Sequence, residues 1–272
     1  HAKSVLDRIV PGYYQRLDEK GAVANSTCCD NTATENKMMA KLMIDSAVVW
    51  ARDHRIDSFR FDLMGHQPRE AMERLQKAVN AATGRRIDVI GEGWNFGEVE
   101  NGKRFVQAAQ KSLNGSGIGT FSDRARDAAR GSSWGSAEDS VRNKGWIHGN
   151  GNAQQADLLR VGLAGAVEGY TMEDRSGYRV PLSRIDYNGQ PAGYASQPGE
   201  VVNYVENHDN QTLFDNNAIK LPRETSREDR ARVQHLGAAL VAFSQGIAYF
   251  HAGQEILRSK SLDRNSYDSG DW

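Results

Sequence analysis

The sequence has little cysteine, no long apolar stretch and almost no net charge. Only two of its 272 residues are cysteine, and no apolar run approaches the ~20 residues that a membrane-spanning helix needs. Its 34 basic and 35 acidic residues leave a formal net charge of -1, so nothing indicates binding to nucleic acid or to an acidic membrane surface. The first residues show neither a signal-peptide core nor a targeting pattern. The length allows one large α/β domain or two small ones.

The two cysteines are neighbours in the sequence, Cys28 and Cys29. Their spacing fits no zinc motif, and adjacent residues cannot cross-link distant parts of a fold. A vicinal redox disulfide is the alternative interpretation, but no basic residue lies close by in the sequence to activate the thiols. We therefore expect two small, partly buried side chains that are not joined.

Helical and strand-like segments alternate along the chain, which predicts a parallel α/β architecture. Apolar spacing and turn residues predict helices at about residues 34–53 (capped by Thr34), 68–82, 101–112, 153–167 and 225–243. Short apolar runs predict strands at 56–63, 87–91, 117–121, 201–205 and 247–251. Residues 122–123 and the Gly-, Pro- and Ser-rich stretch 187–200 are expected to be loops within one domain, residues 1–272.

Three of the strand-like runs lead directly into a carboxylate. These acids are Asp62, Glu92 and Asp209. Barrel enzymes display their chemistry where strands end, and glycosidic bonds are cut by paired carboxylic acids. The pattern predicts an active site built on these three side chains.

Asp62 follows a strand in which alternation places Arg60 on the same face. A neighbouring guanidinium favours the ionised carboxylate that a nucleophile needs at neutral pH. A purely structural Arg–Asp pair at a strand end fits the local sequence equally well.

Glu92 lies between two glycines and is followed by Trp94. Flanking glycines should leave the carboxyl accessible, and an indole offers it the apolar surroundings of a general acid and a surface on which a sugar ring can stack. An exposed Glu in a Gly-rich turn is one alternative. A phosphate-binding loop over residues 91–97 is another, but its glycine spacing is one residue too long and Glu and Trp would crowd a pyrophosphate.

The third acid, Asp209, is preceded by His208. A hydrogen-bonded His–Asp pair is the simplest interpretation, because no second His or Cys stands at a metal-ligand spacing nearby. The Asp30-Asn31 loop offers oxygen ligands for a hard cation, yet it lacks the regular spacing of a calcium loop. The sequence therefore predicts no metal site, although it leaves open whether a structural calcium ion is bound.

The three acids, with the Phe-Arg-Phe-Asp and His-Asp patterns around them, resemble the α-amylase superfamily of glycoside hydrolases. Flanking motifs resemble its pullulanase and limit-dextrinase branch over the whole chain; they lie at residues 4–11, 13–17, 60–65, 91–94, 117–124 and 266–272. The resemblance implies a (β/α)8 TIM barrel of the α-amylase type, present only in part, at about strands 4 to 8. We expect the early strands and the accessory β-domains to be missing from this chain.

The resemblance also implies a role for each matching residue. It makes Asp62 the nucleophile, Glu92 the general acid/base and Asp209 the stabiliser of the transition state. It makes five further residues substrate-binding: Arg60, Trp94, His208, Asn210 and Asp271.

The implied reaction is retaining hydrolysis of α-1,6 branch linkages in pullulan, limit dextrins, amylopectin or glycogen. It requires no cofactor, its partner is an α-glucan, and a polymeric substrate slightly favours a secreted or cell-surface protein. Two alternatives remain beside it: an α-1,4-specific hydrolase of the same superfamily, and a barrel fragment that binds α-glucans without cleaving them.

Overall fold

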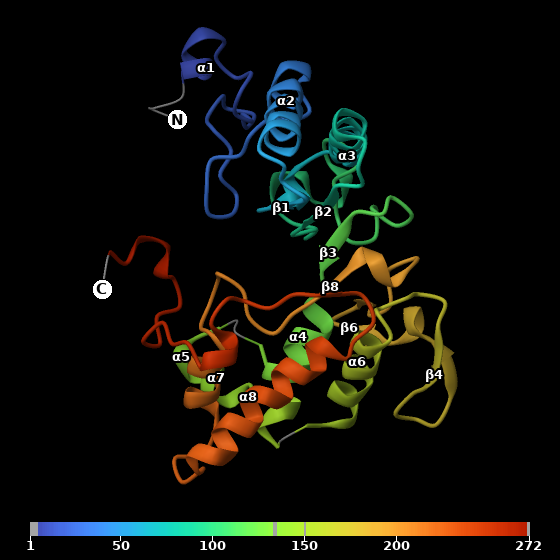
Figure 1. The fold of residues 1–272 in the computed structure, drawn as a ribbon, viewed down its shortest axis with the longest axis vertical. Helices are drawn as coiled ribbons and strands as arrows, with labels where there is room; N and C mark the ends of the chain where they lie inside the picture. Colours follow the sequence, from blue (N-terminus) through green and yellow to red (C-terminus); the bar gives the residue numbers. More distant parts are fainter. Residues whose placement is uncertain (1–4, 133–134, 150, 271–272) are drawn as a thin grey trace. The chain divides into compact units, whose positions relative to one another are not determined.

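The computed structural model describes residues 5–132, 135–149 and 151–270. The chain divides into two compact units, residues 1–120 and 121–272. Figure 1 traces the chain through both units, from blue at the N-terminus to red at the C-terminus.

The first unit is built on parallel strands. β1 (Ser58–Phe61) pairs with β2 (Asp88–Gly91) in a register that places Ser58 opposite Asp88 and Phe61 opposite Gly91. β3 (Gly119–Phe121) continues the parallel pairing, with Gly119 beside Ile90. The three strands confirm the sequence prediction, although each is shorter than the apolar run that predicted it.

Two helices, α2 (Lys37–Asp53) and α3 (Arg69–Thr83), pack side by side in the first unit (Figure 1). The short α1 (Val5–Ile9) precedes them. A buried apolar cluster joins α2, α3 and β2 and includes Ala47, Met72, Leu75, Val79 and Val89. As predicted, Gly84 ends α3, because it takes the left-handed conformation (φ 63°) that favours glycine.

The predicted cap of α2 is wrong. The helix begins after Asn36, and the hydroxyl of Thr34 donates instead to the side chain of Gln67. Tertiary packing thus replaces the local capping bond that the sequence pattern predicts.

The helix predicted at residues 101–112 is absent. A 3-10 helix, η2 (Gly97–Gly102), occupies its start, and Asn101 within it has a left-handed φ of 55°. The backbone beyond η2 pairs with the segment before α3: Ala108 N donates to Gln67 O at 2.8 Å, and Arg69 N donates to Val106 O at 2.8 Å. These long-range bonds take the donors and acceptors that an α-helix would have used.

The second unit also contains a parallel pair, β8 (Val201–Asn203) and β9 (Ile247–Ala248), in which Val202 lies opposite Ile247. Ser122 N donates to Val202 O at 2.9 Å, so the chain after β3 runs beside β8. Parallel strands in both units confirm the α/β class and agree with part of a barrel.

Within its described residues the second unit contains five helices, which Figure 1 labels α4 to α8. They are α4 (Asp123–Arg130), α5 (Ala137–Arg142), α6 (Ala153–Leu163), α7 (Leu213–Lys220) and α8 (Arg227–Ala242). α4 packs against α6, and α7 packs against α8. Only α6 and α8 were predicted from the sequence.

The prediction of a loop at residues 122–123 is wrong, because α4 begins there. The buried residues of α4 include Arg124 and Arg130 as well as alanines. A helix that buries charge has no apolar stripe, so hydrophobic periodicity does not detect it. The loop predicted at 187–200 is interrupted by β7 (Gln190–Pro191), which pairs with β6 (Asp186–Tyr187); another antiparallel pair, β4 (Thr171–Glu173) and β5 (Arg179–Pro181), precedes it.

The described ranges contain no helix that is both long and apolar enough to cross a membrane.

The packing of α3 generates the first prediction. Leu75 is completely buried, whereas Leu42 on α2 is 41% exposed. Leu75→Ala should lower the free energy of unfolding by about 2–5 kcal/mol, through lost burial and the cavity left behind. The matched change Leu42→Ala should cost under about 1 kcal/mol. Urea denaturation of both variants measures this, and equal losses would contradict the packing described here.

Candidate active site

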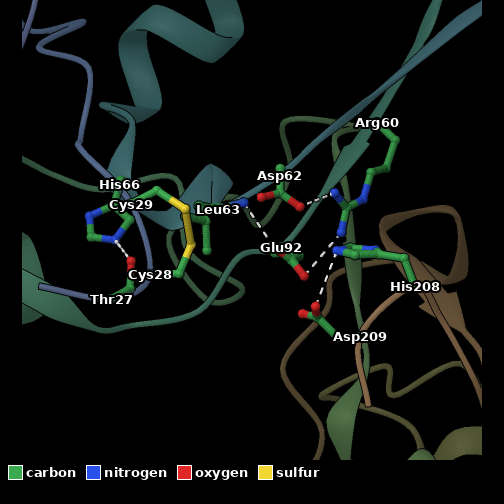
Figure 2. The surroundings of a disulfide bond; sticks show 10 residues. All are labelled: Thr27, Cys28, Cys29, Arg60, Asp62, Leu63, His66, Glu92, His208 and Asp209. Atoms are coloured by element: carbon green, nitrogen blue, oxygen red, sulfur yellow. Dashed lines mark hydrogen bonds and ion pairs between the residues drawn. A yellow bond between two sulfur atoms is a disulfide. The ribbon is translucent and has the colours of Figure 1, made fainter. Parts of the chain in front are cut away.

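Arg60, near the end of β1, holds two of the predicted catalytic acids. Its Nη1 donates to Oδ1 of Asp62, and its Nη2 lies 3.0 Å from Oε1 of Glu92 (Figure 2). The register of the sheet explains why the two acids lie close together, because Phe61 and Gly91 are direct neighbours across the two strands. The residues that follow them, Asp62 and Glu92, therefore leave adjacent strand ends together.

The two carboxylates are close but differ in their surroundings. One oxygen of Asp62 and one of Glu92 lie within 4.8 Å of each other. The side chain of Asp62 is 57% exposed, whereas that of Glu92 is 9% exposed. Oxygens that approach this closely agree with the ~5–5.5 Å arrangement of retaining glycosidases rather than with the ~6.5–9.5 Å arrangement of inverting ones.

The carboxylate of Glu92 is held at both oxygens. The backbone N–H of Leu63 donates to Oε2 at 2.8 Å, while Oε1 faces Arg60 (Figure 2). Leu63 has a left-handed φ of 48°, which turns the chain directly after Asp62. The expectation that Glu92 would be accessible is wrong, because these partners draw it into the protein. Leu63 was missed from the sequence, since a backbone donor leaves no residue signature.

The glycines beside Glu92 are required for close packing. A β-carbon on Gly91 would lie 2.8 Å from the carbonyl oxygen of Phe61, and one on Gly93 would lie 2.6 Å from the methyl group of Thr120. The chain after residue 93 enters the 3-10 helix η2 rather than an α-helix. A dinucleotide loop needs an α-helix N-terminus at that point, so the fold disfavours the phosphate-loop interpretation.

Trp94 follows Glu92 and Gly93 directly, and its side chain is half-buried. Its carbonyl oxygen would lie 2.1 Å from a β-carbon on Gly65. This close approach holds the backbone of Trp94 beside the turn that follows Asp62.

The second unit carries His208 and Asp209, which lie together as the sequence predicts. His208 Nε2 is 3.5 Å from Oδ1 of Asp209, and their side chains are 48% and 62% exposed. Asn207 supports the pair: its Oδ1 accepts a hydrogen bond from the backbone N–H of His208 at 2.9 Å and from the hydroxyl of Tyr249 at 3.0 Å. Asn210 follows with a left-handed φ of 61°. The predicted substrate residue Asp271 lies outside the described residues.

Cys28 and Cys29 are joined by a disulfide (Figure 2), so the expectation of two unjoined side chains is wrong. Both residues are exposed, not partly buried, and sit in a run of bends over residues 26–29. The bends bring neighbouring sulfurs together, a local conformation that residue spacing does not reveal. Because the bridge encloses no intervening residue, it removes little chain entropy from the unfolded state.

A buried arginine anchors the loop that carries the disulfide. Arg16 is 1% exposed and donates to both carboxylate oxygens of Glu35, to Glu98 and to the carbonyl of His66, each at 2.8 Å. Asn31 donates to both oxygens of Glu98, at 3.0 and 3.2 Å. Arg16, Asn31, His66 and Glu98 are far apart in the sequence, so no local pattern predicts that they come together.

Two groups of oxygens bear on cation binding. The acid pair Asp62 and Glu92 has the spacing of metal ligands, but the guanidinium of Arg60 already supplies positive charge to both. In the Asp30-Asn31 loop the amide of Asn31 is turned toward Glu98. The two carboxylates are thus engaged with Arg60, and the side-chain N–H groups of Asn31 with Glu98.

Parallel strands whose adjacent ends present two carboxylates match the active-site architecture of barrel-type glycoside hydrolases. No protein-family model matches the chain. Individual proteins do match it: it is 43% identical to pullulanase 1, chloroplastic, from Arabidopsis thaliana and 46% identical to pullulanase from Klebsiella pneumoniae, each over 99% of this chain. The matches cover 30% and 26% of those two proteins.

Solved structures give the same result. A maltotriose complex of PulA from Klebsiella pneumoniae matches with a TM-score of 0.95 and 44% identity, over 100% of this chain and 30% of that one. A maltotriose-bound mutant pullulanase from Paenibacillus barengoltzii matches with a TM-score of 0.78 and 33% identity, over 96% of this chain and 37% of that one. By sequence and by fold the chain is similar to a segment of these pullulanases, and it spans about a third of their length. The resemblance inferred from the motifs is confirmed.

The Arg16 cluster generates a prediction about pH. Burial alone would raise the pKa of Glu98, but hydrogen bonds from Ser26 and Arg16 outweigh it and lower the pKa from 4.5 to about 2. Ionised Glu98 therefore stabilises the fold fully above about pH 4.5, and this contribution is lost as the pH falls toward 2.

Glu98→Gln, which keeps the shape and removes the charge, should lower the free energy of unfolding by about 1–3 kcal/mol at pH 7. The difference from wild type should shrink between pH 4.5 and 2. Denaturant titrations at several pH values measure it, and a difference that does not change with pH would contradict the assignment.

Proposed function

We propose that this chain carries the catalytic acids of a retaining glycoside hydrolase that cleaves α-1,6 branch linkages in pullulan, limit dextrins, amylopectin or glycogen. The observation that carries the proposal is the pairing of Asp62 and Glu92 on Arg60. Similarity to pullulanases over nearly the whole chain supports the linkage specificity, and two relatives have structures with maltotriose bound.

In the proposed mechanism Asp62 is the nucleophile and Glu92 the acid/base. Asp62 is the more exposed of the two and can approach the anomeric carbon. As the Asp62–carbon bond forms, Glu92 passes a proton to the departing glycosidic oxygen, which leaves a covalent glycosyl-enzyme. Glu92 then takes a proton from water, and the resulting hydroxide releases Asp62 with net retention of configuration.

The remaining predicted residues are proposed to bind the sugar. Asp209 would favour the oxocarbenium-like transition state through sugar hydroxyls, and His208 would bind hydroxyls beside it. Trp94 would supply a stacking surface, Arg60 would orient the nucleophile, and Asn210 and Asp271 would contact the substrate. None of these steps requires a cofactor, because two carboxylates and a water molecule complete the reaction.

We further propose that β1, β2, β3, β8 and β9 correspond to strands four to eight of a (β/α)8 barrel, so that residues 1–272 form part of one catalytic domain. Their order along the chain and their parallel pairings support this numbering. A non-catalytic glucan-binding barrel would be expected to lack at least one of the acids, and this chain contains all three.

The proposal is tested by incubating the full-length protein with pullulan and with amylose and identifying the products. Release of maltotriose from pullulan, with amylose untouched, is the expected result. Cleavage of amylose with intact pullulan would assign α-1,4 specificity instead, and cleavage of neither would reject the hydrolase.

Replacement of the nucleophile gives a sharper prediction. Asp62→Asn should lower kcat by about 10⁴-fold or more, since the covalent step needs an ionised oxygen, while maltotriose binding should change by less than about threefold. Asp57→Asn is the matched control, because Asp57 precedes the same strand, is 82% exposed and pairs with Arg85. Kinetics on pullulan and calorimetric titration measure both. Unimpaired hydrolysis by Asp62→Asn would exclude it as the nucleophile.

A further inference from the structure

We propose that Lys260 is a positioning residue that fixes the catalytic acid Asp209 by binding the backbone on both sides of it. The ammonium Nζ of Lys260 donates to the carbonyl of His208 at 2.9 Å and to that of Asn210 at 2.8 Å. These two residues immediately precede and follow Asp209. The inference deepens the proposed function, on whose assignment of Asp209 it rests.

The ammonium of Lys260 suits the turn at Asp209. The carbonyls of His208 and Asn210 converge on it, and two carbonyl dipoles that converge repel each other unless a donor lies between them. Asn210 has a left-handed φ of 61°, which costs free energy in a residue other than glycine. Lys260 is only 8% exposed, so its ammonium is screened from water and binds the carbonyls strongly.

The side chain of Asp209 gains little support from elsewhere. Its carboxylate is 62% exposed, and the ion-pair partner seen for it among the described residues is His208 at 3.5 Å. A side chain that projects into solvent takes its position from its backbone. The direction of the carboxylate therefore depends on how firmly the turn is held.

Lys260 is itself anchored by buried groups. Its backbone N–H donates to Oδ2 of Asp215 at 2.7 Å, and the hydroxyl of Ser259 donates to Oδ1 of Asp215 at 2.5 Å. Asp215 is 1% exposed and lies in the first turn of α7, where its own N–H donates to the hydroxyl of Thr212 at 3.1 Å. The rigid end of a helix thus sets the position of the ammonium.

The rest of the loop is closed independently of Lys260. The carboxylate of Glu206 accepts a hydrogen bond from the backbone N–H of Leu213 at 2.6 Å, and His251 lies 3.0 Å from its other oxygen. These bonds tie the two ends of the 206–213 segment, and Lys260 ties its tip. Loss of Lys260 should therefore loosen the tip while the ends stay in place.

The experiment compares Lys260→Met and Lys260→Arg in the full-length protein. Lys260→Met should lower kcat on pullulan by about 10–100-fold while KM changes less than about threefold, because a transition-state contact is misplaced. Hydrogen exchange should rise in peptides that cover residues 206–212 and stay unchanged in α8. Lys260→Arg, which keeps the charge and several donors, should recover part of kcat.

Lys220 provides the matched control. It is also a buried lysine of the second unit, 1% exposed, and donates to the carbonyl of Arg130 at 2.7 Å. Lys220→Met should lower the Tm and leave kcat per folded molecule within about twofold.

Two outcomes would overturn the proposal. One is a Lys260→Met variant that loses stability as Lys220→Met does, with kcat and exchange at residues 206–212 unchanged. The other is a fall in kcat without any rise in exchange there. If the wild-type protein cleaves no glucan, the proposed function fails, and the exchange measurement alone decides whether Lys260 holds the turn.

Discussion

The acid pair of the first unit depends on one guanidinium shared between its two carboxylates. The parallel register of β1 and β2 delivers Asp62 and Glu92 to neighbouring strand ends, with oxygens within 4.8 Å. Whenever both carboxylates are ionised, their charges repel at that distance by about 1–4 kcal/mol, depending on how much water screens them. Arg60 contacts both and offsets this repulsion. A slip of one residue in the register would turn these side chains to the opposite face.

The same arginine allows the two acids to have different surroundings. Asp62 remains exposed beside Nη1, whereas Glu92 is buried between Nη2 and the backbone N–H of Leu63. A nucleophile must reach its target, and an acid/base benefits from shelter from bulk water. In the second unit a lysine performs a comparable task on the backbone, since Lys260 binds the carbonyls that flank Asp209.

The sequence predicted those parts of the fold and site that local patterns encode. The strands, α3 with Gly84 at its end, the Arg60–Asp62 contact and the His208–Asp209 pair follow from alternation or direct adjacency. α4 was missed because it buries arginines, and the helix expected at 101–112 is replaced by long-range backbone pairing. Leu63 and Lys260 were missed for a related reason: each acts through groups that only the folded chain brings together.

In the proposed mechanism Asp62, oriented by Arg60, attacks the anomeric carbon. This step is tested most directly by trapping the glycosyl-enzyme with a fluorinated α-glucosyl fluoride and mapping the labelled peptide by mass spectrometry. We expect a single adduct on Asp62 and none in Asp62→Asn. An adduct on Glu92 or Asp209, or a product released with inverted configuration, would contradict it.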